Sequence, residues 1–225
     1  MTIETRMNGI IHAALRRDLD RLALLLERPE DLSPSRLQAL GAHARWLMDV
    51  LHEHHTGEDD RLFPMIRRNN PGVTELLDAM VAEHEAIAAA VSALEGAGAR
   101  AESGEAGAAE ELRGAVAGLR AVLDPHLEHE ERDLTPVVPQ SVSEAEWEEF
   151  EQSNTEGKKP PELAFRGHWI IDNLDPAGVA VVTGLVPAVP RFIMVRLMGG
   201  AYRRRREQLW GGTPALAVRS EPRAT

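Results

Sequence analysis

Apolar residues recur every three or four positions along the first 140 residues, the spacing that keeps one face of an α-helix apolar. Pro29 and the turn at 69–72 interrupt this pattern, and the Gly-rich stretch 96–107 is interpreted as a flexible connection. The pattern predicts four long helices: 7–27, 34–68, a third carrying Leu77 to Leu94, and a fourth carrying Leu112 to Glu130. Short connections between long helices favour an all-α, up-down-up-down four-helix bundle. Pro125 is expected to kink or restart the fourth helix just before His126.

The residues after 140 predict a helical extension. Ser143 and Glu146 form a capping-box pattern that opens a short fifth helix. The segment 153–161 is polar and Pro-rich, which is typical of a linker, and three further helices are expected at 162–172, 176–186 and 190–210. The predicted organisation is a bundle over 1–152, a linker over 153–161, an extension over 162–210 that packs on the bundle as a cover, and a disordered tail over 211–225.

Polar residues occupy positions in all four helices where the apolar spacing calls for leucine. His54, Glu58 and Pro64 recur 72 residues later as His126, Glu130 and Pro136, and His12 recurs as His84 at the same offset. The first half of the bundle is therefore an internal repeat of the second, each half with one lone histidine and one His-x3-Glu pair. Buried polar side chains need partners, so these six side chains predict a shared site.

The repeat indicates a metal centre inside the bundle. A histidine and a glutamate four residues apart lie on one helix face and give a metal two ligands, and a lone histidine on a neighbouring helix adds a third. Which lone histidine joins which pair stays open at this point. Imidazole and carboxylate without thiolate suit iron or manganese better than zinc, and carboxylates can bridge two ions, so two iron ions are favoured. The predicted ligands are His12, His54, Glu58, His84, His126 and Glu130.

A single histidine on an apolar face is more often a satisfied core residue than a ligand, so the argument depends on the repeat. The charged residues around the first pair are interpreted as mostly solvated, or as partners of the ligands rather than ligands: His52, Glu53, His55, Asp59 and Asp60. Asp59 and Glu131 are also 72 residues apart. Each follows a predicted ligand glutamate, so both are candidates to accept the outer imidazole N–H groups.

Composition and net charge exclude several classes of binding partner and metal site. The chain has 225 residues, 43% hydrophobic but only 4% aromatic, so aliphatic side chains must fill the core. A net charge of −11 argues against nucleic-acid binding, and the run of arginines from Arg203 to Arg206 is interpreted as a solvated helix end. The absence of cysteine excludes disulfides and thiolate metal sites. With neither a signal peptide nor an apolar membrane segment apparent, a cytoplasmic location without membrane contact is expected.

The four helices with H-x-x-x-E-D-x-x-L-F-P in the first half and H-x-x-H-E-E in the second resemble the hemerythrin-like, or HHE cation-binding, family over about residues 7–140. The resemblance implies an oxo- or hydroxo-bridged di-iron centre held by the six predicted ligands, with Glu58 and Glu130 as the bridges. Members of the family bind dioxygen, sense iron or oxygen, or handle peroxide and nitric oxide.

One departure from the family pattern bears on function. Oxygen-carrying hemerythrins have a second histidine four residues after the one on the third helix, where this chain has Ala88, with Met80 on the other side of His84. Solvent, or His168 or Tyr202 from the extension, could take that ligand position. Each of these two residues is also explained by simple packing.

The missing ligand favours a reactive site over a carrier, because vacant metal positions admit substrate. The first hypothesis is therefore a di-iron protein that decomposes peroxide, in the manner of a catalase, or reduces nitric oxide. The alternative is a module that binds dioxygen or iron reversibly for sensing or storage, without turnover. A structural zinc protein is disfavoured by six ligands and no cysteine. The sequence identifies neither a protein partner nor an oligomeric state.

Overall fold

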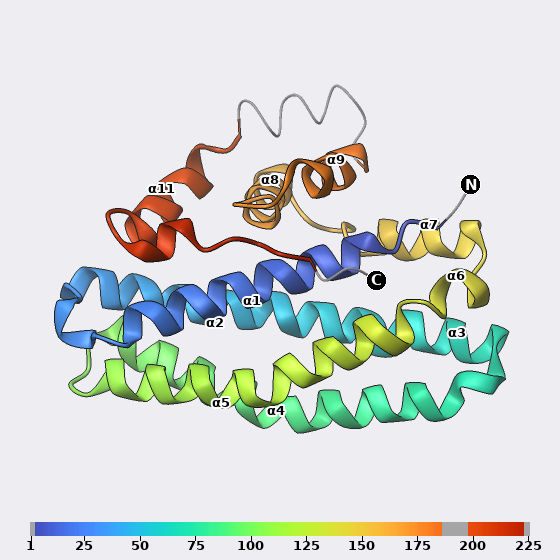
Figure 1. Ribbon diagram of the computed structural model, residues 1–225, viewed down its shortest axis with the longest axis horizontal. Helices are drawn as coiled ribbons and strands as arrows, with labels where there is room; N and C mark the ends of the chain where they lie inside the picture. The colour runs from blue at the N-terminus through green and yellow to red at the C-terminus, as the bar shows by residue number, and fades with distance from the viewer. Residues whose placement is uncertain (1–2, 186–197, 223–225) are drawn as a thin grey trace. The chain divides into compact units, whose positions relative to one another are not determined.

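The computed structural model describes residues 3–185 and 198–222, and its regular elements in those ranges are helical (Figure 1). A single isolated β-bridge joins Leu174 and Ser220. The chain divides into two compact units. Unit 1 comprises residues 22–154 with the first five residues, and unit 2 comprises residues 6–21 with the described part of 155–224. The first helix, α1, spans Arg6–Leu26 and therefore contributes to both units.

Unit 1 is built on three long helices, as the apolar spacing predicts. They are α2 (Pro34–Gly57), α4 (Thr74–Ser103) and α5 (Ala108–His129). α2 packs against α4, and α4 packs against α5. The pairings show antiparallel neighbours, because Gly41 of α2 lies at Gly98 whereas His55 lies at His84. Shorter elements complete the unit: η1 (Pro29–Asp31), α3 (Phe63–Asn69), η3 (Pro71–Val73), α6 (Val138–Ser141) and α7 (Glu144–Ser153), the last with the predicted capping box.

The prediction of a flexible connection over 96–107 is wrong for most of its length. α4 continues as helix to Ser103 and ends at Gly104, which adopts a left-handed conformation with φ of 75°. Glycine occurs inside this helix because the backbones of α2 and α4 approach closely. A Cβ atom on Gly41 would lie 2.4 Å from the carbonyl oxygen of Gly98. The glycines therefore serve helix packing here and do not end the helix.

Replacing Gly41 with alanine is expected to force α2 and α4 apart and to lower the free energy of unfolding by about 1–3 kcal/mol. The matched control is Gly114→Ala on α5, where an added Cβ meets no atom within 4 Å. That change should stabilise the protein by roughly 0.5–1 kcal/mol, because alanine is the better helix former. Chemical denaturation of both variants measures the difference. Equal effects at the two positions would contradict the close approach of the helices.

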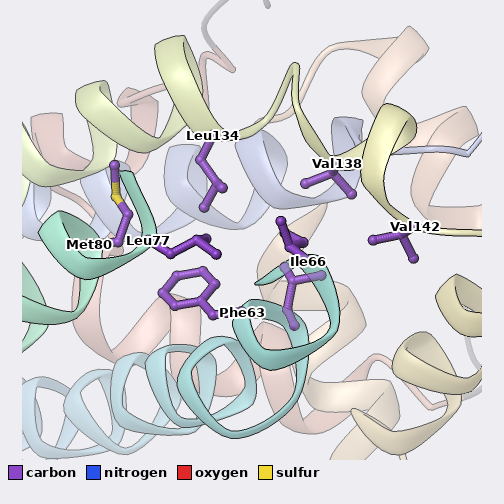
Figure 2. Close-up of a cluster of buried hydrophobic side chains, with 8 residues drawn as sticks. Phe63, Ile66, Leu77, Met80, Leu134, Val138 and Val142 are labelled. Carbon is purple, nitrogen blue, oxygen red and sulfur yellow. The ribbon is translucent and has the colours of Figure 1, made fainter. Parts of the chain in front are cut away.

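One apolar cluster in unit 1 fills the space between α3, the start of α4, and the segment that follows α5 (Figure 2). Its labelled members point toward one another from these elements. The buried members are Leu62, Phe63, Ile66, Leu77, Met80, Leu134, Val138 and Val142. Phe63 also packs on the ring of His84, with ring centroids 5.7 Å apart. The cluster is therefore an apolar wall beside the polar residues described below.

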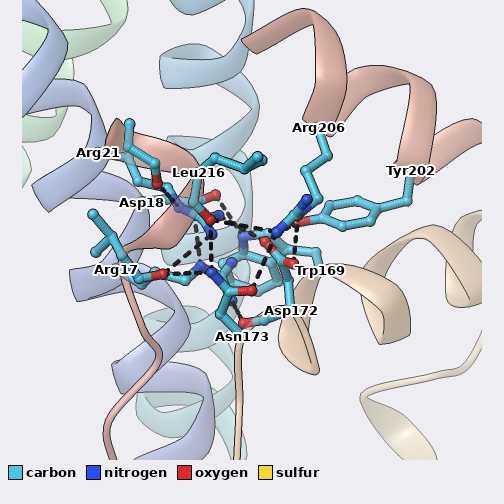
Figure 3. Close-up of polar contacts among 11 residues, drawn as sticks. Arg17, Asp18, Arg21, Trp169, Asp172, Asn173, Tyr202, Arg206 and Leu216 are labelled. Carbon is cyan, nitrogen blue, oxygen red and sulfur yellow. Dashed lines mark hydrogen bonds and ion pairs between the residues drawn. The ribbon is translucent and has the colours of Figure 1, made fainter. Parts of the chain in front are cut away.

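Unit 2 combines the first sixteen residues of α1 with α8 (Pro160–Ile170), α9 (Pro176–Gly184), α11 (Gly200–Trp210) and η6 (Pro214–Ala217). A polar network joins them (Figure 3). Asp18 accepts hydrogen bonds from Arg17, Arg21 and the indole of Trp169, at 2.9, 3.0 and 2.9 Å. Asp172 accepts from Arg21, Tyr202 and Arg206. Because Arg17, Asp18 and Arg21 are fully buried, the extension and α1 share one ionic core.

The last residues are more ordered than the sequence predicts. Residues 211–222, expected to be disordered, include η6 and a buried Ser220, and the carbonyl groups of Ala215 and Val218 accept hydrogen bonds from Arg21. The arginine that holds them lies almost two hundred positions earlier, so no local pattern reveals it. Of the helix predicted over 190–210, the part 190–197 lies outside the described residues, and α11 accounts for the rest.

Candidate metal centre

Both His-x3-Glu motifs end at a change of helix type. α2 gives way to a π-helical turn, η2, at Glu58–Leu62, and α5 gives way to a second one, η4, at Glu130–Leu134. Each predicted ligand glutamate is the first residue of its turn. The prolines account for these π-helical turns, because Pro64 and Pro136 have no backbone N–H to continue the α-helical hydrogen bonds. Wide turns of this kind occur frequently at functional sites. The repeated proline was the signal for them.

The two glutamates lie in contact inside unit 1. Both are buried, and each carboxyl group lies in the electrostatic surroundings of the other. Burial raises the pKa of Glu58 well above its ordinary value, and the neighbouring Glu130 adds to the increase. Two buried carboxyls so close favour a shared proton or a cation between them. Each is also near a histidine of its own motif, with His54 Nε2 3.4 Å from Glu58 and His126 Nε2 3.9 Å from Glu130.

Carboxylates fix the orientation of two predicted ligand histidines. The Nδ1 atom of His84 lies 2.9 Å from Asp59, and the Nδ1 atom of His126 lies 2.8 Å from Glu83. A carboxylate accepts a hydrogen bond at this distance, so Nδ1 is the protonated nitrogen in each ring and Nε2 keeps its lone pair for a metal. Glu83 also accepts a hydrogen bond from His129 at 2.7 Å. Asp59 was predicted in this role, and Glu83 was not.

A further histidine joins these two, and the sequence interpretation placed it wrongly. His55 was expected to be mostly solvated, or a partner of the ligands rather than a ligand, but it is buried. Its ring stacks on that of His84 with centroids 4.0 Å apart, and meets the ring of His126 edge-on at 5.2 Å. One nitrogen from each of the three rings lies within 4.8 Å of the corresponding nitrogens of the other two. The α-helical geometry of α2 turns His52 outward and His55 inward, a difference that the apolar spacing left undecided.

The donor atoms of this cluster fit a cation. Glu58 Oε2, His84 Nε2 and His126 Nε2 are buried, and none has a hydrogen-bond partner in the part of the chain that the structure describes. His84 Nε2 and Glu58 Oε2 lie 3.7 Å apart. Buried polar atoms are rarely left in this way, and a metal ion between them would satisfy all three at once.

Unit 1 thus brings together five of the six predicted ligands: His54, Glu58, His84, His126 and Glu130. His12 lies on the part of α1 that belongs to unit 2, so its role stays a prediction. His168 and Tyr202 also lie in unit 2, with their rings parallel and 6.4 Å apart. The hydroxyl of Tyr202 donates to Asp172 at 3.0 Å, and burial raises its pKa, which disfavours the phenolate form that binds metals. Their metal-binding role stays a prediction as well.

On α4, the residue that the sequence analysis assigned to the missing ligand position does not face the site. Ala88, taken as the vacant position, is exposed. The buried stripe of α4 runs through Met80, His84 and Ile87, so its next member after His84 comes three residues on and not four. Met80 lies on the buried side and belongs to the apolar cluster in Figure 2. The inward positions before and after His84 are therefore occupied by Met80 and Ile87, both apolar.

Comparison with known protein families agrees with this geometry. Residues 11–138, more than half of the chain, match the Hemerythrin HHE cation binding domain. The chain belongs to the hemerythrin HHE cation-binding family. Comparisons with curated proteins and with solved structures found no match. The hemerythrin domain contains both repeated motifs and ends two residues after Pro136, which confirms the resemblance drawn from the sequence.

The matching family is described as a cation-binding domain, without reference to particular ligand residues of this chain. The buried His/Glu cluster of unit 1 is the candidate place for the cation. Within residues 3–185 and 198–222, no helix combines the length and the apolar character needed to cross a membrane.

Proposed function

We propose that this hemerythrin-domain protein holds two iron ions and uses them to react with a small oxidant, either peroxide or nitric oxide. The observation that carries the proposal is the contact between Glu58 and Glu130, one from each half of the repeat. Paired buried carboxylates at this distance can span two ions. The residues that would hold the two ions are His12, His54, Glu58, His84, His126 and Glu130, and the family resemblance implies that both glutamates would serve both ions.

The repeat supports the inclusion of His12. Exchanging the two halves converts His84 into His12, His126 into His54 and Glu58 into Glu130. In unit 1, His84 lies near Glu58 and His126, with ring centroids of the two histidines 4.7 Å apart. The same relation applied to the other half places His12 beside Glu130 and His54. This is our proposal for the pairing that the sequence leaves open.

Iron is favoured over zinc by the donor set. Structural zinc sites are closed, four-coordinate and rich in cysteine, of which this chain has none. Six imidazole and carboxylate donors suit two ions that prefer nitrogen and oxygen. When bound, iron supplies one-electron redox chemistry toward small oxidants.

The surrounding residues have separate tasks. Asp59 and Glu83 hold the Nδ1 protons of His84 and His126, which keeps both Nε2 lone pairs directed at the cation. Phe63 and Met80 exclude water on one side of the site. Because the pKa of Glu58 is raised well above its ordinary value, a cation held by this carboxylate would compete with a proton. Proton release on metal binding is therefore expected.

Anaerobic iron reconstitution of the full chain, followed by separate titrations with peroxide, nitric oxide and dioxygen, tests the reaction. The proposal predicts that peroxide is consumed in many equivalents per protein, or that nitric oxide is so consumed when an external electron donor is supplied, with free iron at the same concentration as the control. A spectral change with dioxygen that argon reverses, with no consumption of the other two, would contradict turnover. That result would establish the alternative, a reversible binding or sensing module.

A further inference from the structure

We propose that His55 is a metal ligand, the third imidazole on the ion that His84 and His126 hold. The inference rests on the proposed di-iron function and adds a residue outside the repeated motif to it. It supplies a replacement for the ligand that α4 lacks, where Met80 occupies the inward position before His84. The replacement comes from α2, one residue after the predicted ligand His54.

The geometry of the three rings favours one shared ion. Each histidine comes from a different helix: His55 from α2, His84 from α4 and His126 from α5. Their ligand nitrogens lie within 4.8 Å of one another. Two nitrogens on a common ion at bonds of about 2.1 Å lie at most about 4.2 Å apart, so small rotations of the side chains are enough. Helices that are already packed together would hold the three rings in place.

Packing alone is a weaker explanation for the position of His55. Its neighbours His84 and His126 both have a buried Nε2 atom without a hydrogen-bond partner among the described residues. Bringing a further polar ring against two such atoms costs free energy unless something binds them all. Asp59, four residues after His55, accepts a hydrogen bond from Nδ1 of His84. The α2–η2 segment thus supplies both a ring beside His84 and the carboxylate that orients it.

The repeat makes this third imidazole unique to one ion. The counterpart of His55, 72 positions on, is Leu127, which is fully buried and cannot bind a metal. The ion held by His84 and His126 therefore has three imidazoles, whereas the one assigned to His12 and His54 has two. An open coordination position would therefore be expected on the second ion. This assigns the place where peroxide or nitric oxide binds.

Anaerobic titration of the full chain with Fe(II) tests the inference, using His55→Ala, His55→Gln and, as a control, His52→Ala. His52 lies on the same helix and is exposed. We expect both His55 variants to bind one of the two ions at least tenfold more weakly, since even an outer-shell change costs about 10–100-fold. The affinity for the other ion, and both affinities of His52→Ala, should match the wild type. The NMR spectrum of the Co(II)-loaded His55→Gln variant should lose one shifted imidazole N–H signal.

The outcomes separate the two proposals. If the wild type binds two irons and both His55 variants do so with unchanged affinities and an unchanged number of shifted signals, His55 is a packing residue. If the wild type does not bind two irons, the proposed function fails, and the inference fails with it. Loss of one affinity and one signal in His55→Gln, with helix content equal to the wild type by circular dichroism, supports the assignment even where His55→Ala unfolds.

Discussion

Replacing Glu58 with glutamine is expected to reduce the iron content of the protein sharply, with binding weakened by more than about 100-fold. Glutamine keeps the size of the side chain but removes the charge and one carboxylate oxygen that would bind the metal. Because iron binds the folded state, the stabilisation that it provides should disappear as well. Elemental analysis and the increase in melting temperature on adding iron measure both effects.

The control for this variant is Glu53→Gln, an exposed position on the same helix. It should keep the iron content and the iron-dependent increase in melting temperature. A Glu58→Gln protein with wild-type values of both would show that the carboxylate is not a ligand.

In the metal-free protein, Glu58→Gln is expected to preserve or raise the free energy of unfolding. Because the pKa of Glu58 is raised in the folded state, the folded protein binds a proton more tightly than the unfolded chain. Stability therefore falls as the pH rises above the ordinary value of 4.5, and continues to fall until the folded-state pKa is passed. Glu58→Gln removes this loss, so the metal-free variant should be at least as stable as the wild type at pH 8. A melting curve at pH 5 and pH 8 for each protein checks the sign.

The second large effect is expected for Asp18→Ala in unit 2. The carboxylate of Asp18 accepts hydrogen bonds from Arg17, Arg21 and Trp169 (Figure 3). Its removal leaves two buried guanidinium groups with part of their pairing lost. Breaking a buried ion pair from one side costs about 3–5 kcal/mol. We expect the C-terminal segment to separate from α1 and to become sensitive to protease, with a large drop in melting temperature.

Glu27→Ala is the matched control, an exposed carboxylate at the end of the same helix. It should change the free energy of unfolding by less than about 0.5 kcal/mol. If Asp18→Ala and Glu27→Ala are equally stable and equally resistant to protease, the ionic core does not hold the C-terminal segment.

The sequence predicts the parts of this protein that depend on local periodicity. The positions of α2, α4 and α5 follow from apolar spacing, and the repeat identifies His54, Glu58, His84, His126 and Glu130, which lie together in unit 1. Periodicity works here because a bundle helix buries one stripe, and a polar residue in that stripe needs a partner.

The remaining features depend on contacts between distant segments. The sequence does not predict the helix through Gly96 and Gly98, because glycine breaks helices in isolation, whereas Gly98 here permits the approach of α2. His55 adjoins the predicted ligand His54, and successive side chains on a helix point about 100° apart. The apolar spacing therefore does not show that both point inward. The order of residues 211–222 depends on Arg21, far away in the chain.

The iron content of the full-length protein tests the central claim most directly. The chain is loaded with Fe(II) without oxygen, freed of excess metal, and analysed for iron, zinc and manganese per polypeptide. The account predicts close to two irons per chain, because each half of the repeat supplies one lone histidine and one His-x3-Glu pair. One tightly held zinc ion, or no metal after iron loading, would contradict it.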